Sequence, residues 1–260
     1  MHNTPLLYGD RLYVQLTHTN AAKVVALNKT NGAEVWAIDR KSDATAECKD
    51  SYASPSVWKN GKDEYLVVHG NDYTTAHSLK DGDEIWRVGD LNSKDHYNRT
   101  FRFVSSPVAT PDLIVVPTCK TGGVVGVKPD ATGNFGAGGK GEQWRLKQGT
   151  PDVPSPLVVD GLVYLAPEGF LECIDGKTGK ELYHERTNTS THRASPVYAD
   201  GKIYFAVEDG TILVVKAGPK FELLAKNKMA DKITASPVIA DGRIYIRGWD
   251  NLYAISQNGK

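Results

Sequence analysis

The stretch Ser195-Pro196-Val197-Tyr198-Ala199-Asp200-Gly201-Lys202-Ile203-Tyr204 decides the fold, because the chain repeats it. Close copies of this Ser-Pro and Asp-Gly pattern, ending in Tyr, occupy Ser155–Tyr164 and Ser236–Tyr245. Looser copies begin near residues 4, 54 and 106, so that six prolines mark the repeats, at positions 5, 55, 107, 156, 196 and 237. A recurrence every 40 to 52 residues indicates a repeat architecture.

Each repeat has a second half, in which a glycine precedes a large aromatic residue by four positions. This pattern occurs in Ala26–Trp36, Ala76–Trp86 and Cys173–Tyr183. In the third repeat a glycine-rich segment from Gly133 to Gly141 intervenes before the aromatic residue, and we interpret it as a flexible insertion. A large ring at a recurrent position supplies apolar burial between neighbouring repeats. We expect four residues to have this docking role: Trp36, Trp86, Trp144 and Tyr183.

The residues within a repeat favour β-strands. Runs such as Ile203–Val207 and Thr211–Val215 are rich in β-branched and aromatic residues, and Asp-Gly, Asn-Gly or Thr-Gly pairs separate such runs. No long window has a helical period. Four short strands in 40 to 50 residues are typical of a β-propeller blade. The sequence therefore predicts an all-β propeller of four-stranded blades, as one domain over residues 1–260 with repeats starting near 4, 54, 106, 155, 195 and 236.

The two ends of the chain suggest a larger ring. The sixth repeat stops after Ala254-Ile255-Ser256, before any aromatic residue, and so lacks its outer strand. Residues 1–3 are too short to supply that strand. We therefore expect a truncated seven- or eight-bladed ring, with one or two blades and an export signal missing upstream. The alternative is a six-bladed ring that closes without this strand. The open edge would favour pairing with a second copy, although the composition does not fix the oligomeric state.

The composition excludes several classes of protein. The 260 residues contain 31 Lys+Arg and 31 Asp+Glu, so no basic excess favours nucleic-acid binding. No apolar run approaches the roughly 18 to 20 residues of a transmembrane helix, and Met1–Pro5 does not begin a signal peptide. The cysteines, Cys48, Cys119 and Cys173, are too scattered for a disulfide framework. We expect buried thiols, and a Cys48–Cys119 disulfide stays open in an oxidising compartment.

The glycine–aromatic signature resembles the tryptophan-docking motif of the pyrroloquinoline quinone (PQQ) repeat family, and the resemblance covers the whole chain. That family includes quinoprotein alcohol dehydrogenases, which carry PQQ and Ca²⁺, non-catalytic BamB-type lipoproteins of outer-membrane assembly, and uncharacterised bacterial secreted proteins. Segments such as Glu47-Cys48, Ser51–Pro55 and Pro151–Pro156 look most like the third group. The chain departs from the quinoprotein enzymes, because it has no adjacent cysteines and about half their length.

The resemblance implies a periplasmic or otherwise extracytoplasmic protein and leaves three functions open. The leading hypothesis is a non-enzymatic, BamB-like module that binds a protein partner or small ligand without a cofactor. The alternative is a quinoprotein oxidoreductase that depends on PQQ and Ca²⁺. The third is a sensor or scaffold domain of a larger exported chain.

Candidate binding residues lie on the irregular loops, since loops on a rigid scaffold concentrate function. The linkers Ala37–Ala53 and Arg87–Ser105 are the longest. Arginines beside carboxylates could clamp an anionic ligand; alternatively, the charges pair with one another and line a wet channel. The candidates on this face are Glu47, Tyr52, His69, Asp72, Arg99, Arg102, Lys120, Asp152, His192, Arg193, Arg247 and Trp249.

Catalytic and metal sites have little support in the sequence. There is no Ser-His-Asp order, no phosphate-binding loop and no HxH or HxxxH pair. Glu47, Asn71 and Asp72 carry oxygens that suit Ca²⁺, yet their spacing is not that of a calcium loop. We therefore expect neither a catalytic residue nor a metal ligand.

Overall fold

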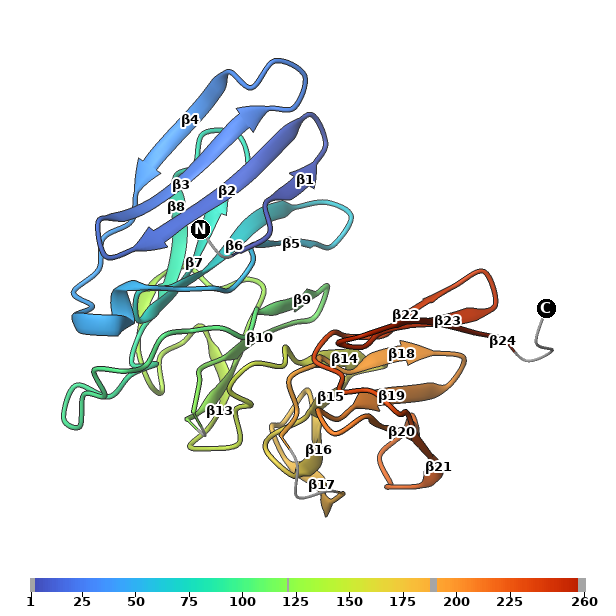
Figure 1. The fold of residues 1–260 in the computed structure, drawn as a ribbon. Helices are drawn as coiled ribbons and strands as arrows, with labels where there is room; N and C mark the ends of the chain where they lie inside the picture. The colour runs from blue at the N-terminus through green and yellow to red at the C-terminus, as the bar shows by residue number, and fades with distance from the viewer. Residues whose placement is uncertain (1–2, 121, 188–190, 257–260) are drawn as a thin grey trace. The chain divides into compact units, whose positions relative to one another are not determined.

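The structure, a computed structural model, describes residues 3–120, 122–187 and 191–256. These residues form 24 β-strands, one 3₁₀ helix (Ala46–Lys49) and no α-helix, as Figure 1 shows. None of them belongs to a helix long and apolar enough to cross a membrane. The chain divides into two compact units, Met1–Gln148 and Gly149–Lys260, and each is described by itself.

The first unit contains three sheets, two of four strands and one of five. The first sheet has the order β1 (Leu6–Tyr8), β2 (Arg11–His18), β3 (Ala21–Asn28) and β4 (Glu34–Asp39). The second has the order β12 (Gly133–Phe135), β8 (Glu84–Val88), β7 (Tyr73–Ser78), β6 (Glu64–Gly70) and β5 (Ser56–Lys59). The third has the order β13 (Glu142–Leu146), β11 (Val124–Val127), β10 (Leu113–Pro117) and β9 (Val108–Thr110).

The second unit contains three antiparallel sheets in simple chain order. The first is made of β14 (Leu157–Val159), β15 (Leu162–Leu165), β16 (Phe170–Asp175) and β17 (Glu181–Arg186). The next is made of β18 (Val197–Ala199), β19 (Lys202–Ala206), β20 (Thr211–Lys216) and β21 (Leu223–Lys228). Within the described residues the last has three strands, β22 (Val238–Ala240), β23 (Arg243–Arg247) and β24 (Leu252–Ser256).

The repeated Asp-Gly pairs form the hairpin turns that the sequence predicts. Asp200 and Gly201 have φ of 49° and 69°, and they connect β18 to β19 with Ala199 opposite Lys202. Asp160-Gly161 and Asp241-Gly242 take the same conformation. Two successive residues with positive φ match the twist of a two-residue β-hairpin, and Asp and Gly adopt this conformation at little cost. The chain thus reverses at the same point of each repeat.

The glycine-rich insertion is more ordered than we predicted. Residues Gly133–Phe135 form β12, which pairs in parallel with β8 and adds a fifth strand to the second sheet. The backbone N–H of Gly89 donates to the carbonyl oxygen of Phe135 at 2.9 Å. The Phe135 ring lies 6.1 Å from the Trp86 ring. The interpretation of a flexible insertion is therefore wrong for Gly133–Phe135, because strand pairing and the partly buried Phe135 ring hold these residues.

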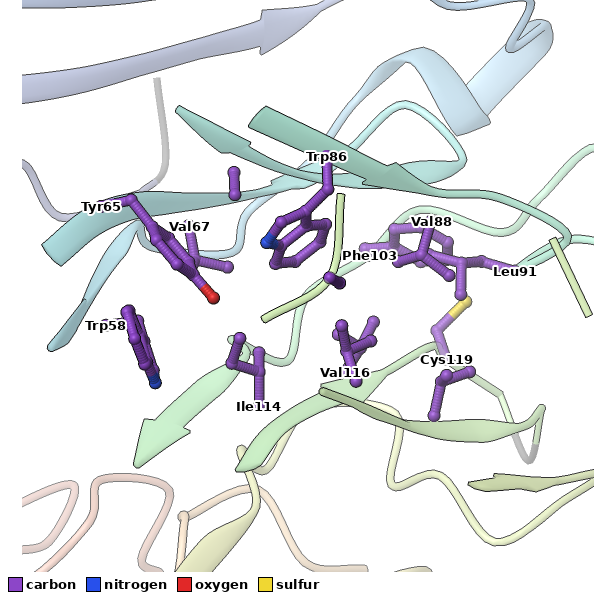
Figure 2. Close-up of a cluster of buried hydrophobic side chains, with 14 residues drawn as sticks. Trp58, Tyr65, Val67, Trp86, Val88, Leu91, Phe103, Ile114, Val116 and Cys119 are labelled. Carbon is purple, nitrogen blue, oxygen red and sulfur yellow. The ribbon is translucent and has the colours of Figure 1, made fainter. Parts of the chain in front are cut away.

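The aromatic residues of the second half-repeat are buried, and three of them touch the following sheet. The Trp36 indole N–H donates to the carbonyl oxygen of Leu79 at 3.2 Å. In Figure 2, Trp86 and Tyr65 of the second sheet point towards Ile114 and Val116 of the third, within one apolar cluster. The Tyr183 ring lies 5.5 Å from the ring of Phe221. The fourth, Trp144, is buried against Gly126 of its own sheet.

All three cysteines are buried free thiols, so the disulfide that the sequence left open between Cys48 and Cys119 is not formed. The prediction of one domain stays a prediction.

Candidate functional site

The two long loops of the first unit lie side by side. Linker one (residues 40–55) connects β4 to β5, and linker two (residues 89–107) connects β8 to β9. Ser51 and Phe103 form a parallel β-bridge, and the N–H of Tyr52 donates to the carbonyl oxygen of Phe103 at 2.8 Å. The N–H of Glu47 donates to the carbonyl oxygen of Arg99 at 3.2 Å. We call the combined surface the two-linker face.

The predicted charges on the two-linker face bond within the face itself. Glu47 and Arg102 form an ion pair, with side chains 50% and 41% exposed. The ammonium group of Lys120 donates to the carbonyl and hydroxyl oxygens of Thr100, at 2.9 and 2.8 Å. Arg99 is exposed, and Tyr52 is half-buried. The structure therefore supports the self-pairing alternative for Glu47 and Arg102, whereas Lys120, which follows β10, bonds to neutral oxygens of linker two.

His69 is a structural residue at the base of this face. Its ring is fully buried, and Nδ1 lies 2.7 Å from the hydroxyl oxygen of Thr74. Burial, together with the charge of Arg40, lowers the pKa of His69 to about 3. The imidazole is therefore neutral near pH 7 and cannot act as a cation towards a ligand.

Asp72 lies in the turn between β6 and β7 and holds linker two. The Tyr97 hydroxyl donates to its Oδ2 at 2.5 Å, and the Asn92 amide donates to Oδ1 at 3.4 Å. Burial raises the pKa of the Asp72 carboxyl, although both hydrogen bonds oppose this shift. The carboxylate thus serves as an acceptor that fixes the loop.

Sequence reasoning missed Arg40, which organises the same turn. The residue is 5% exposed. Its guanidinium donates to Thr75 Oγ1 (3.0 Å), Asn71 Oδ1 (3.1 Å) and two backbone carbonyl oxygens, those of Gly70 and Tyr73 (both 3.2 Å). Burial lowers its pKa to about 9, so it stays charged near pH 7. An arginine after a strand is ordinarily solvated, and nothing in its sequence context signals burial.

The candidates of the second unit are dispersed over several segments. His192 is buried and bridged to Val207, and burial lowers its pKa to about 4. Arg193 Nε lies 3.8 Å from a carboxylate oxygen of Glu208. Asp152 is half-buried, and Arg247 is exposed.

Trp249 is the most accessible aromatic candidate of the second unit. Its side chain is 69% exposed, and the Lys232 ammonium lies 5.9 Å from the ring centroid. The carboxylate of Asp231 accepts hydrogen bonds from the backbone N–H groups of Trp249 and Asn251, both at 3.0 Å. The turn that carries Trp249 is therefore fixed.

The residues present do not fit PQQ or Ca²⁺. Three residues carry oxygens that would suit calcium, and each of these side chains already accepts a hydrogen bond. Glu47 accepts from Arg102, Asn71 from Arg40 and Asp72 from Tyr97. Among the described residues, no three His, Cys, Asp or Glu side chains form a group that could hold a metal ion. The three cysteines are buried free thiols on separate segments, and no two of them are adjacent in the chain, unlike the cysteine pair of the quinoprotein enzymes.

The comparisons with known proteins agree with the architecture. The profile of a family described as outer membrane protein assembly factor BamB matches residues 1–135. The chain is similar to the crystal structure of BamB from Moraxella catarrhalis, with 14% identity and a TM-score of 0.56, over 95% of this chain and 81% of that chain. At this identity the likeness concerns the fold alone. No curated protein matches the sequence. The predicted resemblance and the all-β propeller fold are confirmed.

Proposed function

This chain belongs to the family described as outer membrane protein assembly factor BamB, and from this premise we propose that it is a non-enzymatic scaffold that binds a protein partner through the two-linker face. We also propose that it works in the periplasm or another extracytoplasmic compartment, because the description of the family names outer-membrane assembly.

One observation carries the proposal: polar side chains of the two-linker face bond to one another and so hold the loops in one shape. Glu47 pairs with Arg102, and Asp72 accepts from Tyr97. His69 is buried and neutral near pH 7. A preformed surface loses little conformational entropy when a partner binds, which favours recognition. A general base must come within hydrogen-bond reach of its substrate, and the fully buried His69 offers no such access.

A quinoprotein oxidoreductase is the competing function. The poor fit of the cysteines and oxygen ligands supports our proposal that the chain needs neither PQQ nor Ca²⁺. A titration with PQQ, with and without Ca²⁺, tests this directly. We expect no saturable change in tryptophan fluorescence and no dye reduction with simple alcohols. Calcium-dependent binding with turnover would overturn the scaffold proposal.

Site-specific crosslinking tests the surface. A photoreactive amino acid replaces exposed Arg99 in one variant and exposed Asn31, in the turn between β3 and β4, in a matched control. We expect a discrete covalent adduct with one protein from position 99 and none from position 31. Once the crosslinked protein has been identified and purified, the double variant Arg99→Glu with Arg102→Glu should bind it more weakly than the unmodified chain does. Equal adducts from both positions, or none from position 99, would refute the two-linker face as the site.

A further inference from the structure

A large groove in the first unit is bordered by the outer ends of both linkers, at Lys41 and Asp90, and does not include Glu47, Arg99 or Arg102. It has a volume of about 720 Å³, within the range of sites that hold small molecules or short peptides. The end of β4, with Ile38 and Asp39, forms one wall. β12 and the residue after it, with Asn134, Phe135 and Gly136, form another. We call it the β4–β12 groove.

The arginine in this groove is already neutralised. The guanidinium of Arg87 donates to both carboxylate oxygens of Glu84, at 2.8 and 2.7 Å, and also to the carbonyl oxygen of Lys41. Its charged carbon lies 4.7 Å from the centroid of the Tyr73 ring. Such a bidentate and stacked arginine is fixed in place. It therefore forms part of the wall and offers no free charge to an anionic ligand.

The remaining charge of the groove is negative. A smaller cavity of about 220 Å³ shares Tyr73, Asp90 and Lys94 with the groove. Lys94 is paired with Asp43 at 2.6 Å. Six carboxylates line the two cavities (Asp39, Asp43, Asp72, Asp83, Glu84 and Asp90), together with three cations (Lys41, Arg87 and Lys94). Lys23, which is outside the lining, pairs with Asp39 at 3.4 Å, so the carboxylates still outnumber the cations. In a chain with a net charge of zero, this excess selects a cationic occupant.

The edge of β12 favours an extended peptide over a compact cation. The carbonyl oxygen of Phe135 accepts from Gly89 of the β8 side, so strand alternation turns the N–H and C=O of Asn134 away from β8. Asn134 is exposed and lines the groove. A partner strand can pair with such an outward edge through main-chain hydrogen bonds, while its side chains give specificity.

We propose that the β4–β12 groove binds an extended segment of a protein partner that carries Lys or Arg side chains, with its backbone paired to Asn134 and its cations beside Asp39 and Asp83. The inference rests on the proposed scaffold function, but it assigns a second docking surface. The partner chemistry follows from the acidic excess and from the strand edge.

The probe is a fluorescein-labelled seven-residue peptide of alternating Lys and Val, and the control peptide alternates Glu and Val. Anisotropy titrations use the full chain at two salt concentrations. We expect the Lys peptide to bind, with an affinity that falls as salt rises, and the Glu peptide not to bind. Equal binding of the two peptides, or no binding of either, would overturn the proposal.

Two sets of variants locate the site. The double variant Asp39→Lys with Asp83→Lys should weaken binding of the Lys peptide about ten-fold or more. The double variant Asp63→Lys with Asp112→Lys makes the same change of net charge at exposed positions outside the groove, and it should bind nearly as the unmodified chain does. If the two double variants weaken binding equally, the attraction is general and not that of the groove.

A proline at the edge tests the backbone contact. Asn134→Pro removes the outward N–H without removing a bond to β8, whereas Asn134→Ala keeps it. We expect the proline variant to bind several-fold more weakly than the alanine variant, and equal affinities would exclude strand pairing. These titrations do not depend on crosslinking from Arg99. If the Lys peptide does not bind but position 99 still forms its adduct, only the groove proposal is refuted. If the Lys peptide binds but position 99 forms no adduct, only the two-linker face is refuted.

Discussion

The imidazole of His69 lies flat against the phenyl ring of Phe103, with ring centroids 4.4 Å apart and planes 2° apart. His69 is the penultimate residue of β6 in the second sheet, whereas Phe103 belongs to linker two. The stack therefore ties a long loop to the strand that it crosses. It persists as a stack of neutral rings, because burial lowers the pKa of His69 to about 3.

This burial predicts that the first unit loses stability in mild acid. His77 is also buried, which lowers its pKa to about 4. An unfolded histidine takes up a proton near pH 6.5, so between pH 6.5 and about 4 the unfolded chain binds more protons than the folded one. The stabilisation is complete above this range and is lost as the pH falls. Each histidine contributes up to about 1.4 kcal/mol per pH unit.

Urea unfolding between pH 7 and pH 5, followed by tryptophan fluorescence, checks this prediction. Four of the five tryptophans lie in the first unit, so the signal reports mainly on it. The variant His69→Gln keeps a polar group but cannot be protonated, and it should reduce the pH slope by about 1.4 kcal/mol per unit. An unchanged slope would mean that His69 is protonated in the folded state.

Gly82 and Gly32 allow the inter-sheet contact of Trp36 to be measured. Both occupy the same position of the repeat with positive φ, at 85° and 71°. A Cβ on Gly82 would lie 2.8 Å from the Trp36 ring, whereas a Cβ on Gly32 would meet nothing within 4 Å. Gly32→Ala should cost about 1 kcal/mol of unfolding free energy for its backbone strain. Gly82→Ala should cost roughly 1 to 3 kcal/mol more, because the ring must move.

The same urea titrations measure both glycine variants. Equal losses would show that Trp36 yields without cost and that its docking adds little to stability.

Much of the fold could be predicted from the sequence because it depends on local rules that recur. Asp200-Gly201 and its copies specify the hairpins, and the spacing of Gly82 and Trp86 gives the outer strand with its ring. Each of these features acts within a few residues, and six repeats make the pattern visible.

The rest depends on contacts between segments far apart in sequence. β12 consists of Gly133-Asn134-Phe135, and two of these three residues, Gly and Asn, are depleted in strands, so its pairing with β8 orders it. Linker two is positioned by a bridge from Phe103 back to Ser51. For the candidate site, the irregular loops led to the prediction of a binding face, which stays a prediction. The pairing of Glu47 with Arg102 joins two separate linkers, so no local sequence rule could predict it.

The Glu47–Arg102 pair should matter little for stability. Both side chains are partly exposed, and such pairs contribute about 0 to 1 kcal/mol. A double-mutant cycle with Glu47→Gln and Arg102→Gln should therefore give a coupling energy below about 1 kcal/mol that shrinks further in high salt. A strong coupling would instead mean that linker one depends on the pair for its shape. The double variant Arg99→Glu with Arg102→Glu would then weaken partner binding by disturbing the fold of the linker.

Arg40 should be far more costly to replace than this exposed pair. Its guanidinium supplies hydrogen bonds to four oxygens of the segment from Gly70 to Thr75, and all four acceptors are neutral. Arg40→Met fills part of the volume but leaves buried carbonyl oxygens without a donor, which costs about 1 to 3 kcal/mol for each group. We expect the free energy of unfolding in urea to fall by about 3 kcal/mol or more, and by less for Arg40→Lys, which keeps one donor group.

A buried charge also carries a desolvation penalty. If Arg40→Met leaves the stability unchanged or raises it, this penalty is larger than the stabilisation by the hydrogen bonds. In that case the turn that carries Asp72 keeps its shape without Arg40, and linker two should retain its bond from Tyr97.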